Sequence, residues 1–401
     1  MNKIKPTILY AEIFWMYWGV YCVISSFASV FLLEAGYTNT EIGLLLAAGN
    51  IASVVIQPFS ANLADRSQKL NTLDILIIMT WIIAFFEIFT WLVGQKSSVL
   101  FIAYLLVVAF HGCMQPLLNS VDAMFVRIGK RADYGISRSI GSLGFSLTSM
   151  GLGVLVAAAG AGSLPLVSEG YLALMLVGLF FLRKQYKGFS RDAKKTAVAA
   201  SGQKQEITMK AFAARHKLFL LITAGIFLIF YHHQIINYFM LQIFQNVGGG
   251  SADIGIYYSL MSLLEIPALI GFSKLKKRFS TCFLLKLGTV GLVLRGILMY
   301  TASSPLGVQL SLVVNPIGFP LFLGAIVQYI SEIMDEGEAV RGQSMYVVVI
   351  TASAVVSSFT GGMILDGWGA DRLLLICLLL CVLGAAVILP LIDKAAVECR
   401  H

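Results

Sequence analysis

Two stretches of the sequence share one layout, and together they decide the fold. Residues 41–66 read EIGLLLAAGNIASVVIQPFSANLADR, and residues 253–278 read DIGIYYSLMSLLEIPALIGFSKLKKR. In each, a long apolar run opens at a glycine and closes at an arginine 23 residues later. Such a recurrence indicates an internal repeat, in which the second half of the chain copies the architecture of the first.

The whole chain is as apolar as these two stretches. It has 401 residues, 58% of them hydrophobic and 12% charged, whereas soluble proteins carry about 25% charged residues. Apolar runs of about 20 residues, long enough to cross a bilayer as helices, recur throughout. We therefore expect an all-α membrane protein with twelve transmembrane helices in two six-helix halves. The expected spans are 8–34, 40–62, 71–94, 98–127, 134–160, 165–183, 217–245, 252–274, 281–301, 305–334, 341–365 and 369–391.

The basic residues indicate how the chain is oriented. With the N-terminus inside, nearly all Lys and Arg fall in inner loops, and the outer loops hold only Lys96 and Arg372. This asymmetry predicts that both termini are cytoplasmic. The polar stretch 184–216 then forms a cytoplasmic linker on the anionic lipid surface, between an N-terminal half at 1–183 and a C-terminal half at 217–401.

The composition also excludes several functions. The net charge of +8 reflects topology and lipid contact, so we expect no nucleic-acid partner. No phosphate-binding glycine loop is present, which argues against ATP as the energy source. No nucleophile–base pair and no metal-ligand set is visible, so we expect neither an enzyme nor a metal site. We expect no cofactor, a proton as the coupling ion, and a monomer.

Glu265 and Arg295 are ionisable residues inside expected spans. Their helices place them roughly 15 and 21 Å from the inner membrane surface, within mutual reach of long side chains. A charge inside hydrocarbon is costly and is by default a functional hypothesis. We expect this pair to couple a proton to transport, the alternative being a structural ion pair.

Asp122 and Arg138 flank the loop between the fourth and fifth spans, and a carboxylate facing a guanidinium suits a polar solute. Asn119 lies one turn before Asp122 and extends a polar stripe that includes His111. We expect Asp122, Arg138 and Asn119 to bind substrate. The alternative is an arginine that only reaches the membrane surface beside a packed polar seam.

Other polar residues inside spans are weaker candidates. His233 in the seventh span and Asn315 before Pro316 in the tenth are expected to line the cavity, or else to pack with satisfied hydrogen bonds. Glu87 is expected to line the cavity or to reach the outer headgroups.

The stretch from Tyr134 to Phe145 (YGISRSIGSLGF) resembles the fifth helix of the lactose-permease family of oligosaccharide:proton symporters. The segments FWMYWG (14–19) and IQPFSANLADR (56–66) fit the same pattern, as do Asp122, Glu265 and Arg295. The neighbouring phenylpropionate:proton symporters share much of this pattern. The resemblance covers nearly the whole chain and implies the major facilitator fold, with its substrate site at the membrane midplane.

By position, this resemblance implies that Asp122 and Arg138 hold the substrate and that Phe145 stands where the family stacks an aromatic ring on it. Arg295 matches a coupling arginine. Gly318 stands in place of the family's proton-carrying glutamate, which would move proton coupling to Glu265.

We therefore expect a multi-pass transporter of a bacterial inner membrane that takes up a small polar organic solute with protons by alternating access. A sugar or oligosaccharide is favoured. An aromatic acid, a nucleoside, or a drug:proton antiport in the opposite direction are the alternatives, and a non-transporting receptor is a further one.

Overall fold

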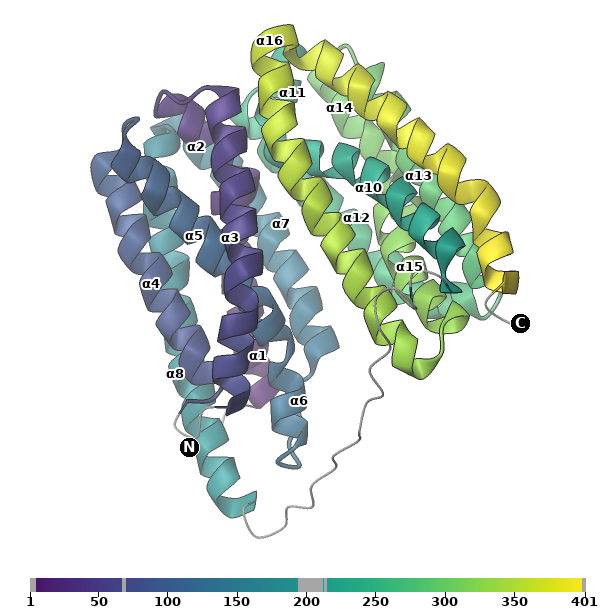
Figure 1. The fold of residues 1–401 in the computed structure, drawn as a ribbon. Coiled ribbons are helices and arrows are strands. Elements are labelled where there is room, and N and C mark those ends of the chain that lie inside the picture. Colours follow the sequence, from purple (N-terminus) through teal and green to yellow (C-terminus); the bar gives the residue numbers. More distant parts are fainter. Residues whose placement is uncertain (1–4, 67–69, 194–211, 213–214, 399–401) are drawn as a thin grey trace. The chain divides into compact units, whose positions relative to one another are not determined.

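The computed structural model describes residues 5–66, 70–193, 212 and 215–398, and in these ranges it holds helices and no strands. The chain up to Ala193 forms α1 Pro6–Tyr21, a π-helix Cys22–Ser26, α2 Ala28–Glu34, α3 Asn39–Arg66, α4 Thr72–Val93, α5 Ser98–Asn119, α6 Val121–Val126, α7 Tyr134–Ala159, a 3-10 turn Ala161–Ser163 and α8 Leu164–Ala193 (Figure 1). The remainder forms α10 Lys217–Tyr238, α11 Met240–Asn246, α12 Ser251–Lys276, α13 Thr281–Tyr300, α14 Pro305–Leu310, the 3-10 helix η3 Ser311–Ile317, α15 Phe319–Ile333 and α16 Glu336–Glu398.

Eleven segments of the described chain are long and apolar enough to cross a membrane. The last of them, Glu338–Val397, is broken at Gly369, whose backbone is left-handed (φ 78°). The two sides of this break are separate helices that run in different directions, as the top of α16 shows in Figure 1. Counted this way, the described chain has the twelve predicted spans, and the predicted all-α membrane fold is confirmed.

The helices group into two compact units. The first comprises Met1–Ala200 together with Ile254–Ser259 of α12, and the second comprises Ser201–Asp253 and Leu260–His401. Within the first unit α1 packs on α7 and α8, and α4 packs on α5 and α8. Within the second, α10 and α13 both pack on α16.

Several spans of the described chain are irregular along their length. The first span passes through the π-helix Cys22–Ser26, and the carbonyl of Ile24 in this stretch accepts a hydrogen bond from Tyr104 on α5 (3.1 Å). The seventh breaks at Phe239, and the tenth passes through η3, which contains Pro316. Irregular backbone at membrane depth persists only where other groups of the protein form hydrogen bonds with its free N–H and C=O groups.

The helix of the sixth span continues past residue 183, where we expected the membrane-spanning part to end and the cytoplasmic linker to begin. In the described chain α8 reaches Ala193, and residues 184–193 contain only one helix-weakening glycine and no proline. Arg183 and Lys187 on this extension form ion pairs with Asp74 at the start of α4. The rest of the expected linker at 194–211 and 213–214 lies outside the described residues.

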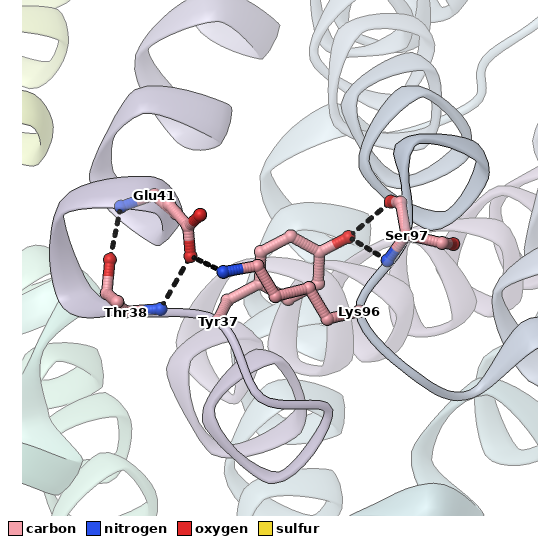
Figure 2. Close-up of polar contacts among 5 residues, drawn as sticks. All are labelled: Tyr37, Thr38, Glu41, Lys96 and Ser97. Carbon is pink, nitrogen blue, oxygen red and sulfur yellow. Dashed lines mark hydrogen bonds and ion pairs between the residues drawn. The ribbon is translucent and has the colours of Figure 1, made fainter.

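A polar brace joins two loops at the end of the first unit opposite its N-terminus (Figure 2). Lys96 Nζ contacts Glu41 Oε2 at 2.7 Å, and the Tyr37 hydroxyl donates to the Ser97 carbonyl at 2.7 Å. Glu41 also accepts from the backbone N–H of Thr38, in the manner of a capping box at the start of α3. The loops before α3 and before α5 are therefore tied together.

In the second unit α10 and α16 approach each other through glycine. A Cβ on Gly384 would lie 2.6 Å from the carbonyl oxygen of Gly225, and one on Gly225 would lie 2.9 Å from that of Gly384. Small residues that let helix backbones meet are a main source of helix association in membranes.

Gly384→Ala should therefore destabilise the second unit. The added methyl meets backbone atoms that cannot rotate away, at a cost of about 1–3 kcal/mol. Thermal unfolding of the purified protein in detergent measures this. Gly367→Ala, in the part of α16 that precedes the break at Gly369, is the control, because no atom lies within 4 Å of its Cβ. Equal loss of stability in both variants would contradict the interpretation.

Candidate functional site

The first unit contains a guanidinium stacked on an indole. Arg138, one turn into α7, lies with its Cζ 4.2 Å from the ring centroid of Trp18 on α1. Its Nη1 donates to Ser142 Oγ at 2.7 Å, one turn along the same helix. Stacking and this hydrogen bond hold the planar cation in one orientation.

Further aromatic rings surround this stacked pair. Tyr17 lies parallel to His111 of α5, with centroids 4.2 Å apart. Tyr21 packs edge-on against Trp18 (5.1 Å) and lies 6.3 Å from Phe145. We call Trp18, Tyr21, Arg138 and Phe145 the cation–aromatic cluster.

Two glycines of α7 make room for the indoles of α1. A Cβ on Gly141 would lie 2.6 Å from Trp18 Cδ1, and one on Gly144 would lie 2.6 Å from Trp15 Cγ. Because Gly141 is one turn after Arg138, its missing side chain is what lets Trp18 lie beneath the guanidinium.

Asp122 does not lie against Arg138. In the described chain no ion pair joins them; Asp122 sits half-buried on α6 beside Tyr10, with one buried carboxylate oxygen that lacks a hydrogen-bond partner. The helix breaks between Asn119, which ends α5 and is exposed, and Asp122, so the expected continuous stripe is interrupted. His111 is buried and turned toward Tyr17.

A second polar centre lies in the other unit, around Arg295. This side chain is 1% exposed; its Nη1 donates to Asn315 Oδ1 at 3.1 Å, and its Nη2 lies 3.5 Å from the sulfur of Met261. Asn315 is fully buried and donates to the Met261 carbonyl at 3.4 Å. Since arginine stays charged, its partners must stabilise a permanent cation.

Glycines of α13 bring Asn315 to this arginine. A Cβ on Gly291 would lie 2.6 Å from the carbonyl oxygen of Ile317, and one on Gly288 would lie 2.8 Å from backbone atoms of Phe322. Gly288, Gly291 and Arg295 share one face of α13. This face meets the end of η3 at Gly291 and the backbone of α15 at Gly288.

Glu265 lies on the same face of α12 as Met261, whose sulfur contacts Arg295. It is half-buried and one turn after Met261, and residues four apart on a helix are neighbours. His233 is buried and stacks on Phe319 at 4.0 Å, and His232 lies beside Gly296, next to Arg295 in sequence. The structure thus gathers Arg295, Asn315, Glu265 and both histidines in one unit.

The contacts of Arg138 with Trp18 and of Arg295 with Asn315 were not predicted from the sequence. Trp18 belonged to a recognised segment, but nothing in its spacing says that it stacks on Arg138. The pairs of glycines at 141 and 144 and at 288 and 291 were the available signal, because each marks a face where another backbone or ring approaches closely.

Asn315→Leu should lower stability by about 1–3 kcal/mol, because it leaves a buried guanidinium N–H without its acceptor. Asn315→Asp should lose less, since it keeps an oxygen at this position and adds an opposite charge. Thermal unfolding in detergent compares the two. A larger loss for the aspartate variant would contradict the acceptor role.

Comparison with known proteins gives one family. A family model described as "MFS_1 like family" matches residues 7–376. Similar proteins include the quinolone resistance protein NorA of Staphylococcus aureus (strain MSSA476), 26% identical over 354 residues and covering 85% of each chain. The uncharacterized transporter YwbF of Bacillus subtilis (strain 168) is 23% identical over 351 residues, covering 83% of this chain and 80% of the relative.

Solved structures of transporters share the fold. The nucleoside transporter NupG aligns with a TM-score of 0.71 at 17% identity, over 98% of this chain and 99% of its own. The POT family transporter PepTSo aligns with a TM-score of 0.70 at 11% identity, over 98% of this chain and 97% of its own.

Proposed function

The chain belongs to the MFS_1 like family of transporters, and from this premise we propose that it carries a planar, polar aromatic solute across a bacterial inner membrane with proton coupling. The observation that carries the proposal is the cation–aromatic cluster. Its guanidinium is held flat against Trp18 by Ser142, with Tyr21 and Phe145 beside it. A fixed planar cation bordered by rings suits an aromatic solute that bears a carboxylate or several hydrogen-bond acceptors.

This chemistry favours the aromatic alternative over the sugar that the resemblance favoured. A sugar needs an open ring face on which to stack and a carboxylate that accepts its hydroxyls. In the first unit the guanidinium already covers one face of Trp18, and Asp122 lies beside Tyr10 instead of Arg138. Sugar transport stays as the competing outcome of the experiment below.

Glu265 and Arg295 are the proposed coupling residues. Arg295 is a permanent cation held by Asn315, and Glu265 is a half-buried carboxylate on the helix face that reaches it. Protonation of Glu265 weakens its attraction to that cation, and a change in this attraction can bias alternating access. No cofactor enters this mechanism.

We propose that both termini face the cytoplasm. Lys and Arg gather at the helix ends near the termini, where Arg183 pairs with Asp74 and Lys286 pairs with Asp393. At the opposite end the ion pair of Lys96 with Glu41 involves one of only two basic residues expected outside.

Transport assays in proteoliposomes test the substrate class. Aromatic carboxylates, nucleosides and sugars are added in turn while a pH electrode records the medium. Proton movement with aromatic carboxylates or nucleosides, and none with sugars, is the expected result. Proton movement with sugars alone would contradict the aromatic assignment, and the sign of the change reports symport or antiport.

Variants of the cluster test its role. Arg138→Lys keeps the charge but loses the planar stack, and Trp18→Leu removes the ring beneath it. Each should raise the half-saturating concentration of an anionic substrate about 5-fold, equivalent to the roughly 1 kcal/mol of a cation–aromatic contact. Trp18→Phe keeps a ring and is the matched control. Unchanged half-saturation in Trp18→Leu would contradict the proposal.

Glu265→Gln should abolish substrate-driven proton movement while substrate counterflow persists, because the amide cannot take a proton at this position. The same electrode recording and an isotope counterflow assay measure the two activities. Full proton movement in this variant would contradict the coupling role.

Export of aromatic drugs is the second candidate. The name of the S. aureus relative, a quinolone resistance protein, supports it. The same cluster would then bind its solute from the cytoplasm, and proton movement in the assay above would have the opposite sign. Drug susceptibility of cells that express the chain checks this directly.

A further inference from the structure

A buried carboxylate that the proposed mechanism does not use lies in the first unit. Glu87 of α4 is 1% exposed, so it reaches neither solvent nor the membrane surface, contrary to both expectations from the sequence. Its Oε2 accepts a hydrogen bond from Thr90 Oγ1 at 2.7 Å, and its Oε1 is buried without a hydrogen-bond partner.

A hydroxyl on the neighbouring helix points at the same carboxylate. Ser168 of α8 is fully buried and lies beside Glu87, yet its Oγ makes no hydrogen bond of normal geometry. Buried hydroxyls without partners are rare, and each calls for an explanation such as an ion or proton that completes the site.

A second carboxylate lies at the same depth. The ion pair of Asp74 with Arg183 sets the register between antiparallel α4 and α8. Glu87 lies about 20 Å from Asp74 along α4, and Glu169 lies about 20 Å from Arg183 along α8, at 1.5 Å per residue. Glu169 is half-buried, is electrostatically coupled to Glu87, and has one buried carboxylate oxygen without a partner.

The surroundings offer no cation to these acids. Among the described residues, no Lys, Arg or His forms an ion pair with either carboxylate. From α5 the titratable group that faces Glu87 is Tyr104, whose hydroxyl already donates to the Ile24 carbonyl. Ionising both carboxylates in such a place is costly, because each charge is desolvated and the two repel.

We propose that Glu87 and Glu169 form a proton-binding site within the first unit, in which the two carboxylates share one proton and the hydroxyls of Thr90 and Ser168 complete the site. Binding adds one proton and changes the charge of the pair from −2 to −1, with no bond broken. Glu169, the more exposed member, takes the proton up, and Glu87 retains it. The site is separate from Glu265 and does not depend on which solute is carried.

Infrared difference spectroscopy of the full-length protein in liposomes tests this site without any substrate. Spectra recorded at neutral and alkaline pH should show a protonated carboxylic-acid band that disappears on alkalinisation. Glu87→Gln should remove the band, and Glu169→Gln should shift its frequency, because the proton is no longer shared.

Glu34→Gln is the matched control. Glu34 lies at the same end of the unit, but its carboxylate already accepts hydrogen bonds from the backbone N–H groups of Ala161 and Gly162. This variant should leave the band unchanged. If Glu87→Gln does not fold, Glu87→Asp serves instead and should shift the band.

Two results would overturn the proposal. One is a band that stays unchanged in both the Glu87 and the Glu169 variants. The other is a band that disappears when sodium replaces a bulky organic cation in the buffer at constant pH, since the oxygens would then bind an alkali cation and not a proton. Failure of the transport assays leaves this test unaffected.

Discussion

The fully buried guanidinium of Arg295 is the constraint on which the second unit depends. A charge in hydrocarbon needs partners from the protein, because no water is there to solvate it. One such partner is the side-chain oxygen of Asn315, which lies in the 3-10 helix η3 directly before Pro316. Gly291 lets α13 meet the backbone at the end of that stretch, and Gly288 lets it meet the backbone of α15 that follows. The buried charge, the break in the tenth span and the glycines of α13 therefore depend on one another.

The first unit meets the same demand in a different way. Arg138 is half-buried, and a ring stabilises it in place of a buried amide. Here too a glycine one turn away, Gly141, permits the contact. Arg138 is thus a half-buried cation held against a ring, whereas Arg295 is a fully buried cation held by protein groups.

The spans could be predicted because hydrocarbon thickness demands about 20 apolar residues in each, and basic loops separate them. The position of each ionisable residue along its helix followed from 1.5 Å per residue. The direction in which each side chain projects did not follow, because successive residues on a helix point about 100° apart and a break in the helix changes this rotation. Asp122 illustrates this: the break at Ser120 separates it from Asn119 and leaves it beside Tyr10.

Which residues can carry a proton follows from how each charge is accommodated. Arginine cannot lose its proton, so the enclosed Arg295 must be stabilised as a cation in every state of the protein. A carboxylate inside hydrocarbon is either ionised or protonated, and its hydrogen-bond partners and neighbouring charges determine which form is favoured. Glu34 accepts hydrogen bonds from backbone N–H groups, whereas Glu87 has hydroxyls and a second acid around it. The two proposed proton sites therefore differ in their surroundings: Glu265 lies on the helix face that reaches the fixed cation Arg295, whereas Glu87 lies beside hydroxyls and a second acid.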